Sequence, residues 1–582
     1  MLRLLFLIMI YSLTINAQQT TIGTAGNTFK NLETFPKETV LVHYNSTVLF
    51  PGETLYYQVY CLDKISLKVS KFSKIAYLVL INEDLDYVFK HKIELKDGIG
   101  YGDFFVPVDL SSGNYKIVAY TKWMLNDNDF NIEDVNIINP YRKGYSRQKI
   151  SMETQNKDIP IKKFKELPLG KDLVLNNKYY GKRERVDLGL AELIKNNKFG
   201  NYSLSVFKKY SFNQPDFNHF VRKKVDKIAE LSNLSEIKSD YIYLPELRGE
   251  LISGKIKRKN NSDFNREIEI GVSLTNSNQT RIITSDSKGN FNFNIFSRNV
   301  NSTDLLIQIM DDQIKDFDVV LDSFPKPRLN ELNFIDLAIE PNMEKSIIQR
   351  SIYNQIENNY YSIKPDSIPK RDMDVPFYGE KGVYKYNLDD FTRFETVKET
   401  LVEIIEGLWS RKDEDGKDSF VVRGLYQDQE EIGYKPLLLV DGIIEQNQDK
   451  IINGKANYIE SISYLRDIYY LGLKAYRGIV IIKTKANNYI DFLNPESIKK
   501  MELNAIQNGT KKYFRCNYDD GNLDRIPDYR HQLLWLPNIK ISDKNEKIFF
   551  FTSDIEGEFV VSLEGLTIDG KPLSIIQSFW VQ

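Results

Sequence analysis

The chain has 582 residues, too many for a single hydrophobic core, and this length predicts about four to six domains. A net charge of -2 excludes a global basic field that would attract nucleic acid. Only 4 histidines are present, which argues against metal sites and general-base catalysis, since both depend on this residue.

The N-terminus has the features of a signal peptide over residues 1–17. Arg3 supplies the positive charge, the stretch from Leu4 to Ile15 is mostly apolar, and Ala17 ends a suitable cleavage site. This apolar run is shorter than the roughly 20 residues of a membrane-spanning helix, and no later run is longer. We therefore expect an exported protein with peripheral rather than integral membrane association.

The two cysteines, Cys61 and Cys516, do not make a disulfide framework. A single bridge between them remains open in an oxidising compartment. Each lies in a strand-like or aromatic stretch, where a buried free thiol is the favoured state.

A short pattern recurs along the chain: a glycine, a polar residue and an aromatic residue. Two copies are longer, TSDSKGNF (284–291) and TSDIEGEF (552–559); there the aspartate can bond its own backbone and the glycine three residues on accepts a positive φ. Apolar and polar residues alternate after the pattern, as in Phe291, Phe293 and Ile295. Each copy predicts a turn that leads into a half-buried antiparallel strand. The copies begin at Gly102, Gly113, Gly200, Gly289 and Gly557.

Composition changes along the chain predict a mainly β protein, with several tandem β-sandwich domains and one α/β domain. The segments expected are a polar arm at 18–38, a sandwich at 39–140, a second sandwich at 160–240, a third at 245–325, a linker with a helix at 326–387, a mixed α/β unit at 388–487 and a C-terminal sandwich at 500–582. The helical pattern of the linker runs from Met343 to Ile356.

Two stretches of the first sandwich carry a family resemblance. ETVLVHYNSTVLFPGETLYYQVYC (38–61) and GYGDFFVPVDLSSGNYKIVAYTKWM (100–124) resemble a macroglobulin-like domain of the MG2 type. Alpha-2-macroglobulins trap proteases through a thioester in a Cys-Gly-Glu-Gln motif. Here Leu62 follows Cys61 and Asn517 follows Cys516, so the resemblance implies the fold without the trap.

Later segments resemble two further kinds of domain. ELRGELISGKIKRK (246–259) is similar to the start of a carboxypeptidase regulatory-like domain, which is a structural or binding module. The mixed α/β unit resembles the plug domain of TonB-dependent outer-membrane receptors; the pieces that match are PLLLVDGII (436–444), IESISYLRD (459–467) and LGLKAYRGIVIIKTK (471–485). Within it, Ile459, Ile462 and Leu465 fall three residues apart, which predicts a helix between two strands.

The plug-like unit contains an Asp-Gly pair at Asp441 and Gly442, directly after an apolar run. This pair is a turn signal, so we expect Asp441 to set backbone geometry rather than to act as a catalytic acid. Gly472 and Gly478 belong to the same structural motif.

A true receptor of this family needs a membrane barrel of about twenty strands, which the residues after Lys485 are too few to supply. The stretch PDYRHQLLWLPNI (527–539) looks like the start of another macroglobulin-like sandwich. The order of domains resembles barrel-less envelope proteins of the Bacteroidota. That resemblance concerns the architecture. Together with the signal peptide and a plug-like unit without its barrel, it leads us to expect a periplasmic protein associated with the outer membrane, with the cell surface as the less favoured location and a barrel protein or complex as its partner.

Candidate catalytic and metal-binding residues are few. His531 has Asp528 three residues before it and no serine or cysteine partner in its segment, so we expect an interface or surface histidine there. His531 and Trp535 are the candidate interface residues. The other histidines are isolated in the sequence: His43, His91 and His219.

Two acidic stretches are candidate calcium-binding sites. In KDEDGKD (412–418), counting from Asp413, Gly416 is fourth and Gly424 is twelfth, whereas an EF-hand needs glycine sixth and glutamate twelfth. We therefore predict a solvated hairpin there. LNDNDFNIED (125–134) is predicted to be a solvated loop, with weak calcium binding as the alternative.

The chain has no Gly-x-Ser-x-Gly, His-Glu-x-x-His or phosphate-loop motif. The sequence therefore predicts a non-enzymatic protein without a cofactor, which docks onto an outer-membrane barrel or assembly through its plug-like and sandwich domains. One alternative is an accessory of TonB-linked uptake that works with a separate barrel. The other is a protein that binds or hydrolyses envelope peptides or glycans.

Overall fold

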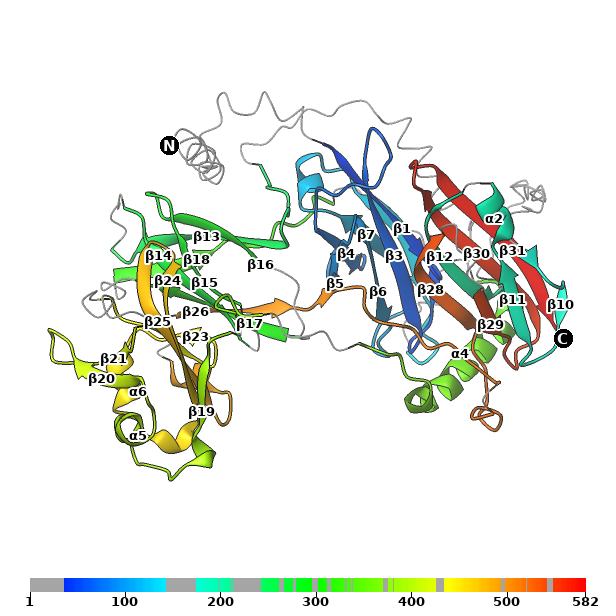
Figure 1. The fold of residues 1–582 in the computed structure, drawn as a ribbon. Coiled ribbons are helices and arrows are strands. Elements are labelled where there is room, and N and C mark those ends of the chain that lie inside the picture. Colours follow the sequence, from blue (N-terminus) through cyan, green and yellow to red (C-terminus); the bar gives the residue numbers. More distant parts are fainter. Residues whose placement is uncertain are drawn as a thin grey trace. The chain divides into compact units, whose positions relative to one another are not determined.

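The chain is mainly β in the computed structural model (Figure 1). The expected signal peptide, His219, and most of the polar arm lie outside the described residues. The structure describes residues 36–142, 174–196, 198–210, 212, 242–260, 266–275, 279–295, 302–310, 316–329, 332–334, 337, 339–369, 375–379, 381–424, 434–493, 498–519, 521–541 and 548–582.

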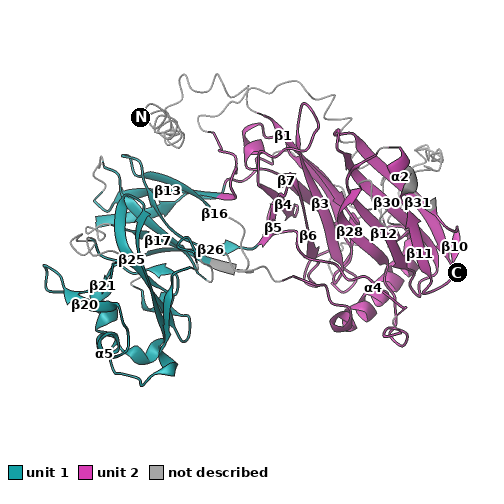
Figure 2. Ribbon diagram, in the orientation of Figure 1, with its two compact units in different colours: residues 1–21, 251–324, 370–505 teal, residues 22–250, 325–369, 506–582 magenta. Residues whose placement is uncertain are grey.

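Two compact units divide the chain, and each is assembled from segments that are distant in sequence (Figure 2). Unit 1 combines residues 251–324 with residues 370–505. Unit 2 combines residues 22–250, 325–369 and 506–582. Among the described residues, no helix has both the length and the apolar character needed to cross a membrane.

The first sandwich of unit 2 pairs a sheet of three strands with a sheet of six. The smaller sheet has the order β1 (Glu38–Tyr44), β3 (Thr54–Asp63) and β6 (Ile99–Phe105). The larger has the order β2 (Val48–Leu49), β8 (Asn131–Ile137), β7 (Gly113–Tyr120), β4 (Ile75–Ile81), β5 (Tyr87–Glu94) and β27 (Ile506–Gln507). The apolar run of β4 is buried along its whole length, as expected of a central strand.

One copy of the glycine–polar–aromatic pattern in this sandwich was interpreted wrongly from the sequence. Gly113 begins β7, as predicted. Gly102 instead lies inside β6, opposite Tyr57. A Cβ at that glycine would come within 2.5 Å of the Tyr57 hydroxyl, so this position needs glycine for a close approach and not for a turn.

The second sandwich of unit 2 corrects the expected domain division. We predicted separate sandwiches at 160–240 and 500–582, but strands from both segments form one pair of sheets. The larger sheet has the order β10 (Tyr179–Tyr180), β31 (Pro572–Val581), β30 (Gly557–Thr567), β12 (Gly200–Lys208) and β28 (Gln532–Ile541). The smaller has the order β29 (Ile548–Phe551), β11 (Arg185–Gly189) and β9 (Val174–Leu175).

Backbone hydrogen bonding explains the shared sandwich. β12 pairs antiparallel with β28 on one side and with β30 on the other, and both partners come from the C-terminal segment. A strand left without these partners would expose two rows of unpaired amides and carbonyls.

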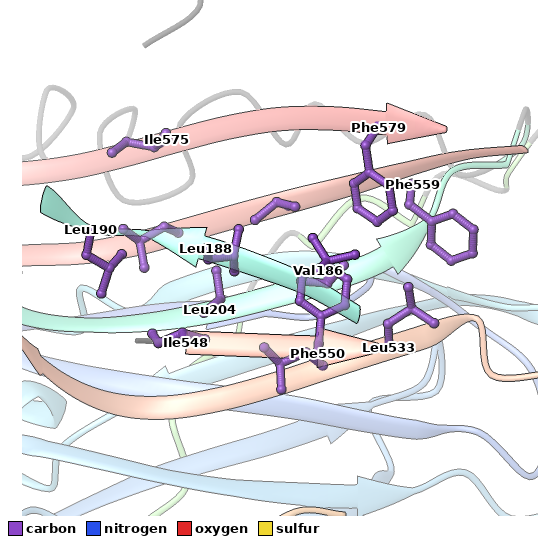
Figure 3. Packing of buried hydrophobic residues seen from close by; sticks show 14 of the residues in the cluster. Val186, Leu188, Leu190, Leu204, Leu533, Ile548, Phe550, Phe559, Ile575 and Phe579 are labelled. Carbon is purple, nitrogen blue, oxygen red and sulfur yellow. The ribbon is translucent and has the colours of Figure 1, made fainter. Parts of the chain in front are cut away.

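The core of this second sandwich draws on both segments, with the larger share from the C-terminal one (Figure 3). Phe559 and Phe579 stack with ring centroids 5.6 Å apart, and Phe550 approaches Phe579 at 5.8 Å. Val186 and Leu204 from the earlier segment are completely buried in the same cluster. Tyr202, Leu204 and Val206 line this core, as the alternation after Gly200 predicts. The expected half-buried strand is wrong here, because Ser203 and Ser205 on the other face are buried as well.

Unit 1 contains another sandwich. Its smaller sheet has the order β16 (Asn290–Ile295), β13 (Glu250–Arg258) and β18 (Phe317–Leu321). The larger sheet has the order β15 (Thr280–Thr284), β14 (Glu269–Leu274), β17 (Ser302–Ile309) and β26 (Ile498–Asn504). The turn predicted in TSDSKGNF is confirmed, since Asp286 Oδ1 accepts from Asn290 N at 2.8 Å and Gly289 has φ +81. Phe291, Phe293 and Ile295 then point into the core.

The rest of unit 1 is a mixed sheet with two short helices, α5 (Val397–Glu403) and α6 (Gln448–Ile452). The strand order is β19 (Tyr384–Asn387), β24 (Ile459–Leu471), β25 (Lys474–Thr484), β22 (Leu437–Val440), β23 (Ile443–Ile444). A separate hairpin joins β20 (Leu408–Lys412) and β21 (Asp418–Val422), which confirms the hairpin predicted at 412–418.

The helix predicted at 459–467 is wrong, because these residues form strand β24. A register shift between Ile459 and Ser461 marks a β-bulge, and Ile459, Ile462 and Tyr464 all join one core cluster. Leu465 belongs to another cluster. The bulge produces a spacing of three on one face of a strand, and that spacing imitated a helix.

The helix predicted from Met343 to Ile356 is confirmed as α4 (Glu344–Asn359) in unit 2. Its buried face includes Ile347, Arg350, Ser351 and Asn354, which fall at the spacing of one helical face. This face anchors the segment 339–369 to the sandwiches of unit 2.

Because strands from both segments share one core, a core mutation in the C-terminal segment should also destabilise the strands of the earlier segment. Phe579→Ala should lower the free energy of unfolding of that sandwich by roughly 3–5 kcal/mol, because it removes a fully buried ring. Hydrogen exchange should accelerate in β12 as well as in β30. Ile568→Ala is the control, since that side chain is 74% exposed. Unchanged protection of β12 in Phe579→Ala would contradict a common core.

Candidate functional site

Asp441 and Gly442 form the two-residue turn between β22 and β23. Their φ values of +50 and +79 match the type I′ turn that joins antiparallel strands. The Asp441 carboxylate accepts from Thr484 N at 2.7 Å, the Thr484 hydroxyl at 2.5 Å and Tyr489 N at 3.1 Å. The two oxygens therefore bond to the last residue of β25 and to the chain just after it, and the carboxylate holds the local backbone.

The other two motif glycines also have positive φ. Gly472 (φ +63) is in the two-residue loop of the β24–β25 hairpin, where a Cβ would come within 2.7 Å of Glu269 Oε1. Gly478 (φ +85) lies in β25 beside the second register shift, and its Cβ would come within 2.5 Å of the Leu465 carbonyl oxygen. Both positions require glycine for backbone reasons.

One face of the mixed sheet is covered by the sandwich of unit 1. Thr280 Oγ1 donates to Gly442 O at 2.7 Å, and Gln308 Nε2 donates to Ile444 O at 3.0 Å. A single apolar cluster joins the two parts: Ile282, Met310, Leu437, Leu439, Ile444, Leu465 and Ile479. This face is therefore filled from within the unit and is not open to a partner.

The end of the β24–β25 hairpin is apolar and exposed. Tyr470 is 80% exposed and Leu473 is 72% exposed. Glu269 fixes this tip, because its Oε1 accepts from Leu473 N at 2.7 Å and its Oε2 pairs with Lys474 at 3.4 Å. We call Tyr470 and Leu473 the hairpin tip; the sequence analysis missed it, although two aromatics before a Gly-Leu pair could have indicated it.

His531 and Trp535 lie at an interface, and it is an internal one. Trp535 is 3% exposed, and its ring lies 5.2 Å from the ring of His43 and stacks on Tyr56 at 5.9 Å. His531 Nε2 is 3.4 Å from Glu53 Oε1. Both residues thus join the second sandwich of unit 2 to the first.

We call this contact between the two sandwiches the seam. It brings one face of β1 and β3 against β12, β28 and β30. His43 Nδ1 and Ser203 Oγ are 2.5 Å apart, Tyr60 Oη donates to Glu564 O at 3.1 Å, and Asn538 N donates to Gln58 Oε1 at 2.5 Å. The serines that alternate with the core residues of β12 are therefore buried rather than solvated.

A buried ion pair that the sequence did not reveal lies beside His531. Arg350 donates to the two Glu53 oxygens, Nε to Oε1 at 2.7 Å and Nη2 to Oε2 at 2.8 Å, and both side chains are 1% exposed. Phe50, Tyr210 and Phe212 surround the guanidinium at 4.8–5.8 Å. The only sequence signal was an arginine at helical spacing between Ile347 and Asn354.

The charge of Arg350 decides the state of the Glu53 carboxyl. Burial alone would raise the pKa of Glu53, but the adjacent guanidinium, the nearby His531 and hydrogen bonds hold that pKa below its usual value. The pair is therefore ionised at neutral pH and ties helix α4 to the turn before β3.

The carboxylates of the 125–134 stretch have lysine partners instead of converging on a cation site. Lys37 and Asp127 are 3.4 Å apart, and Lys64 and Asp129 are 2.6 Å apart. The part of the chain that the structure describes has no cluster of three or more acidic, histidine or cysteine side chains placed to hold a metal ion.

The two remaining candidate groups are structural. Asp413 Oδ1 accepts from the backbone of Asp415 and Lys417 in the hairpin turn, at 3.1 and 2.9 Å. Cys61 and Cys516 are both free and buried, as expected from their surroundings.

Bacterial macroglobulins are among the solved structures to which the chain is similar. No family model and no curated protein matches it. Among solved structures it is similar to Escherichia coli alpha-2-macroglobulin activated by porcine elastase (8% identity, 94% of this chain and 44% of that chain, TM-score 0.24). It is also similar to Salmonella alpha-2-macroglobulin reacted with methylamine (8% identity, 97% of this chain and 40% of that chain, TM-score 0.24).

A different match is the dimeric latent PorU from Porphyromonas gingivalis, with 10% identity, 50% of this chain and 33% of that chain, and a TM-score of 0.15. The chain spans less than half the length of each of these proteins. At such low TM-scores the likenesses carry no argument about activity, substrates or partners.

The buried ion pair predicts a large effect of a single substitution. Arg350→Leu should lower the free energy of unfolding of unit 2 by roughly 3–5 kcal/mol in urea titrations, because Glu53 is left charged and buried. Lys182→Ala removes an exposed pair with Glu556 in the same unit and should have a much smaller effect, because water screens that pair. Equal effects of the two substitutions would show that the Arg350 pair is not a main support.

Two substitutions of Asp441 should lower the stability of unit 1 by different amounts. Asp441→Gly keeps the positive φ and loses only the carboxylate bonds, which should cost about 2 kcal/mol. Asp441→Ala should cost about 1 kcal/mol more, because alanine resists this conformation. Thermal unfolding of unit 1 measures both variants. Equal stability of the two would contradict the backbone role of the left-handed turn.

Proposed function

We propose that the chain is a non-enzymatic, multidomain envelope protein that docks onto an outer-membrane barrel protein or assembly. In this role it is exported to the periplasm, associates peripherally with the outer membrane, and serves transport, secretion or outer-membrane protein biogenesis as an accessory subunit. The resemblance of its segments to macroglobulin-like, regulatory-like and plug domains motivates the proposal.

The observation that supports docking is the hairpin tip. Large apolar side chains that are exposed together are unusual outside contact sites. Leu473 lies in the two-residue turn, which Glu269 fastens to the sandwich, and Tyr470 lies in β24 just before it. A contact made by such a rigid element loses little conformational entropy on binding.

The plug-like sheet itself is a poorer docking face, because the sandwich of unit 1 fills one side of it. The contact proposed here therefore uses the end of the β24–β25 hairpin rather than the broad face of the sheet. Two aromatic or apolar anchors of this kind can dominate the free energy of a small interface.

The test is affinity purification from detergent-solubilised envelopes after crosslinking on intact cells. We expect the wild-type chain to recover a barrel protein, and the variant Tyr470→Ser with Leu473→Ser to recover it at least roughly tenfold less well. Val402→Ser is the matched control, because Val402 is also 72% exposed and lies in unit 1.

The outcomes separate the rival functions. Recovery of the chain alone, in the soluble fraction, would overturn docking. A TonB-dependent barrel as the recovered partner would favour the uptake accessory. Binding of envelope peptides or glycans that survives the tip substitutions, with no barrel partner, would favour the remaining alternative.

A further inference from the structure

We propose that the seam in unit 2 is an acid-sensitive joint: it is closed at neutral pH, and it opens when His43 and His531 take up protons. Two histidines of a chain that has only 4 lie on this one contact. Each of the two sandwiches also has its own core, so the seam can separate while both remain folded.

His43 lies between the sandwiches with no place for a second proton. Its Nδ1 bonds to Ser203 Oγ, and its Nε2 is buried without a hydrogen-bond partner. Trp535 covers the ring from β28. The titratable side chains on the facing strands include Tyr60 and Tyr56 on β3; Tyr60 donates to a carbonyl and Tyr56 stacks on Trp535. On β30, the Glu564 carboxylate accepts from a serine hydroxyl.

His531 lies at the other end of the seam among opposing charges. Glu53 Oε1 is 3.4 Å away, but Arg350 already occupies both oxygens of that carboxylate. The end of β12 contributes Lys208, whose amide donates to His531 O. A proton on His531 therefore adds a second cation beside a buried arginine, with a single carboxylate between them.

Burial gives the direction of the pH effect. It lowers the pKa of His43 to about 3, and burial with the nearby Arg350 charge, opposed by Glu53, lowers the pKa of His531 to about 4. In an opened seam both imidazoles return to water and to the ordinary value near 6.5. The open form thus binds more protons, so closure is complete above that value and weakens as the pH falls.

The size of the shift in the open–closed equilibrium follows from this difference in proton binding. At pH 5 each histidine shifts the equilibrium toward the open form by about thirtyfold, and the two together by about a thousandfold. The contacts that resist opening combine these polar contacts with the stack of Trp535 on Tyr56 and with two apolar clusters. One cluster consists of Leu41, Tyr60, Leu62 and Leu566; in the other, Tyr210 and Phe212 meet Val48, Phe50 and Ile347, and both are smaller than the core of the second sandwich. Separation of the sandwiches therefore requires less loss of apolar burial than unfolding of either one.

Hydrogen exchange on the full chain tests the joint, at pH 7.5 and pH 5.0 and corrected for intrinsic rates. The reporter is the amide of Asn538, which donates across the seam to Gln58. We expect its protection to fall by at least roughly a hundredfold at pH 5.0, while amides in the centres of β7 and β30 keep theirs. His43→Gln with His531→Gln should abolish most of this change.

Two further variants keep the test decisive. His91→Gln is the matched control, because the half-buried His91 contacts Tyr57 within the first sandwich, away from the seam, and its replacement should leave the response of Asn538 intact. His531→Gln alone, at an 18% exposed side chain, should remove about half of the logarithmic change if the double variant does not fold. Loss of protection in β7 and β30 together with the seam, or an unaltered response in the histidine variants, would overturn the proposal.

Discussion

The architecture of unit 2 depends on the hydrogen bonds of one strand, β12. It pairs along its length with β30 and, through two register shifts, with β28. Both partners are synthesised more than three hundred residues later, after the chain has contributed to unit 1 twice. The backbone of β12 is therefore satisfied only when the C-terminal segment is in place, and the second sandwich is a product of the whole chain.

The two faces of β12 explain why unit 2 is a joined pair of sandwiches. Tyr202, Leu204 and Val206 fill the core of the second sandwich, while Ser203 and Ser205 are buried against the first. A strand with one apolar and one small polar face can pack on both sides if the polar groups find partners. The seam supplies such partners in His43, Tyr60 and Gln532.

The buried charged groups of unit 2, like its buried serines, need hydrogen-bond partners within the protein. Arg350 and Glu53 are removed from water, and each is held by the other and by neighbouring carbonyl or amide groups. A neutral His531 can lie beside them, whereas a protonated one introduces another positive charge. Stability of the contact and its response to acid thus arise from one arrangement of buried polar side chains.

In unit 1 the mixed sheet and the preceding sandwich each have a core of their own and also share an apolar cluster, which joins them. Asp441 fastens the turn of that sheet to the end of β25, and Glu269 fastens the hairpin tip to the sandwich. These local clamps leave Tyr470 and Leu473 as the prominent apolar groups of a rigid element, which is the arrangement expected of a contact site.

The amino-acid sequence by itself determined the mainly β class, the turn at Asp441, the turn at Asp286 and helix α4, because each depends on residues close together in the chain. Only the tertiary structure decided that strands from 174–208 and 532–581 belong to one sandwich, that 459–467 is a bulged strand, and that Arg350 meets Glu53. Pairing between distant strands, or between distant charged side chains, produces no repeating pattern in the sequence. It depends on which unpaired strand edges and which charges come together when the chain folds.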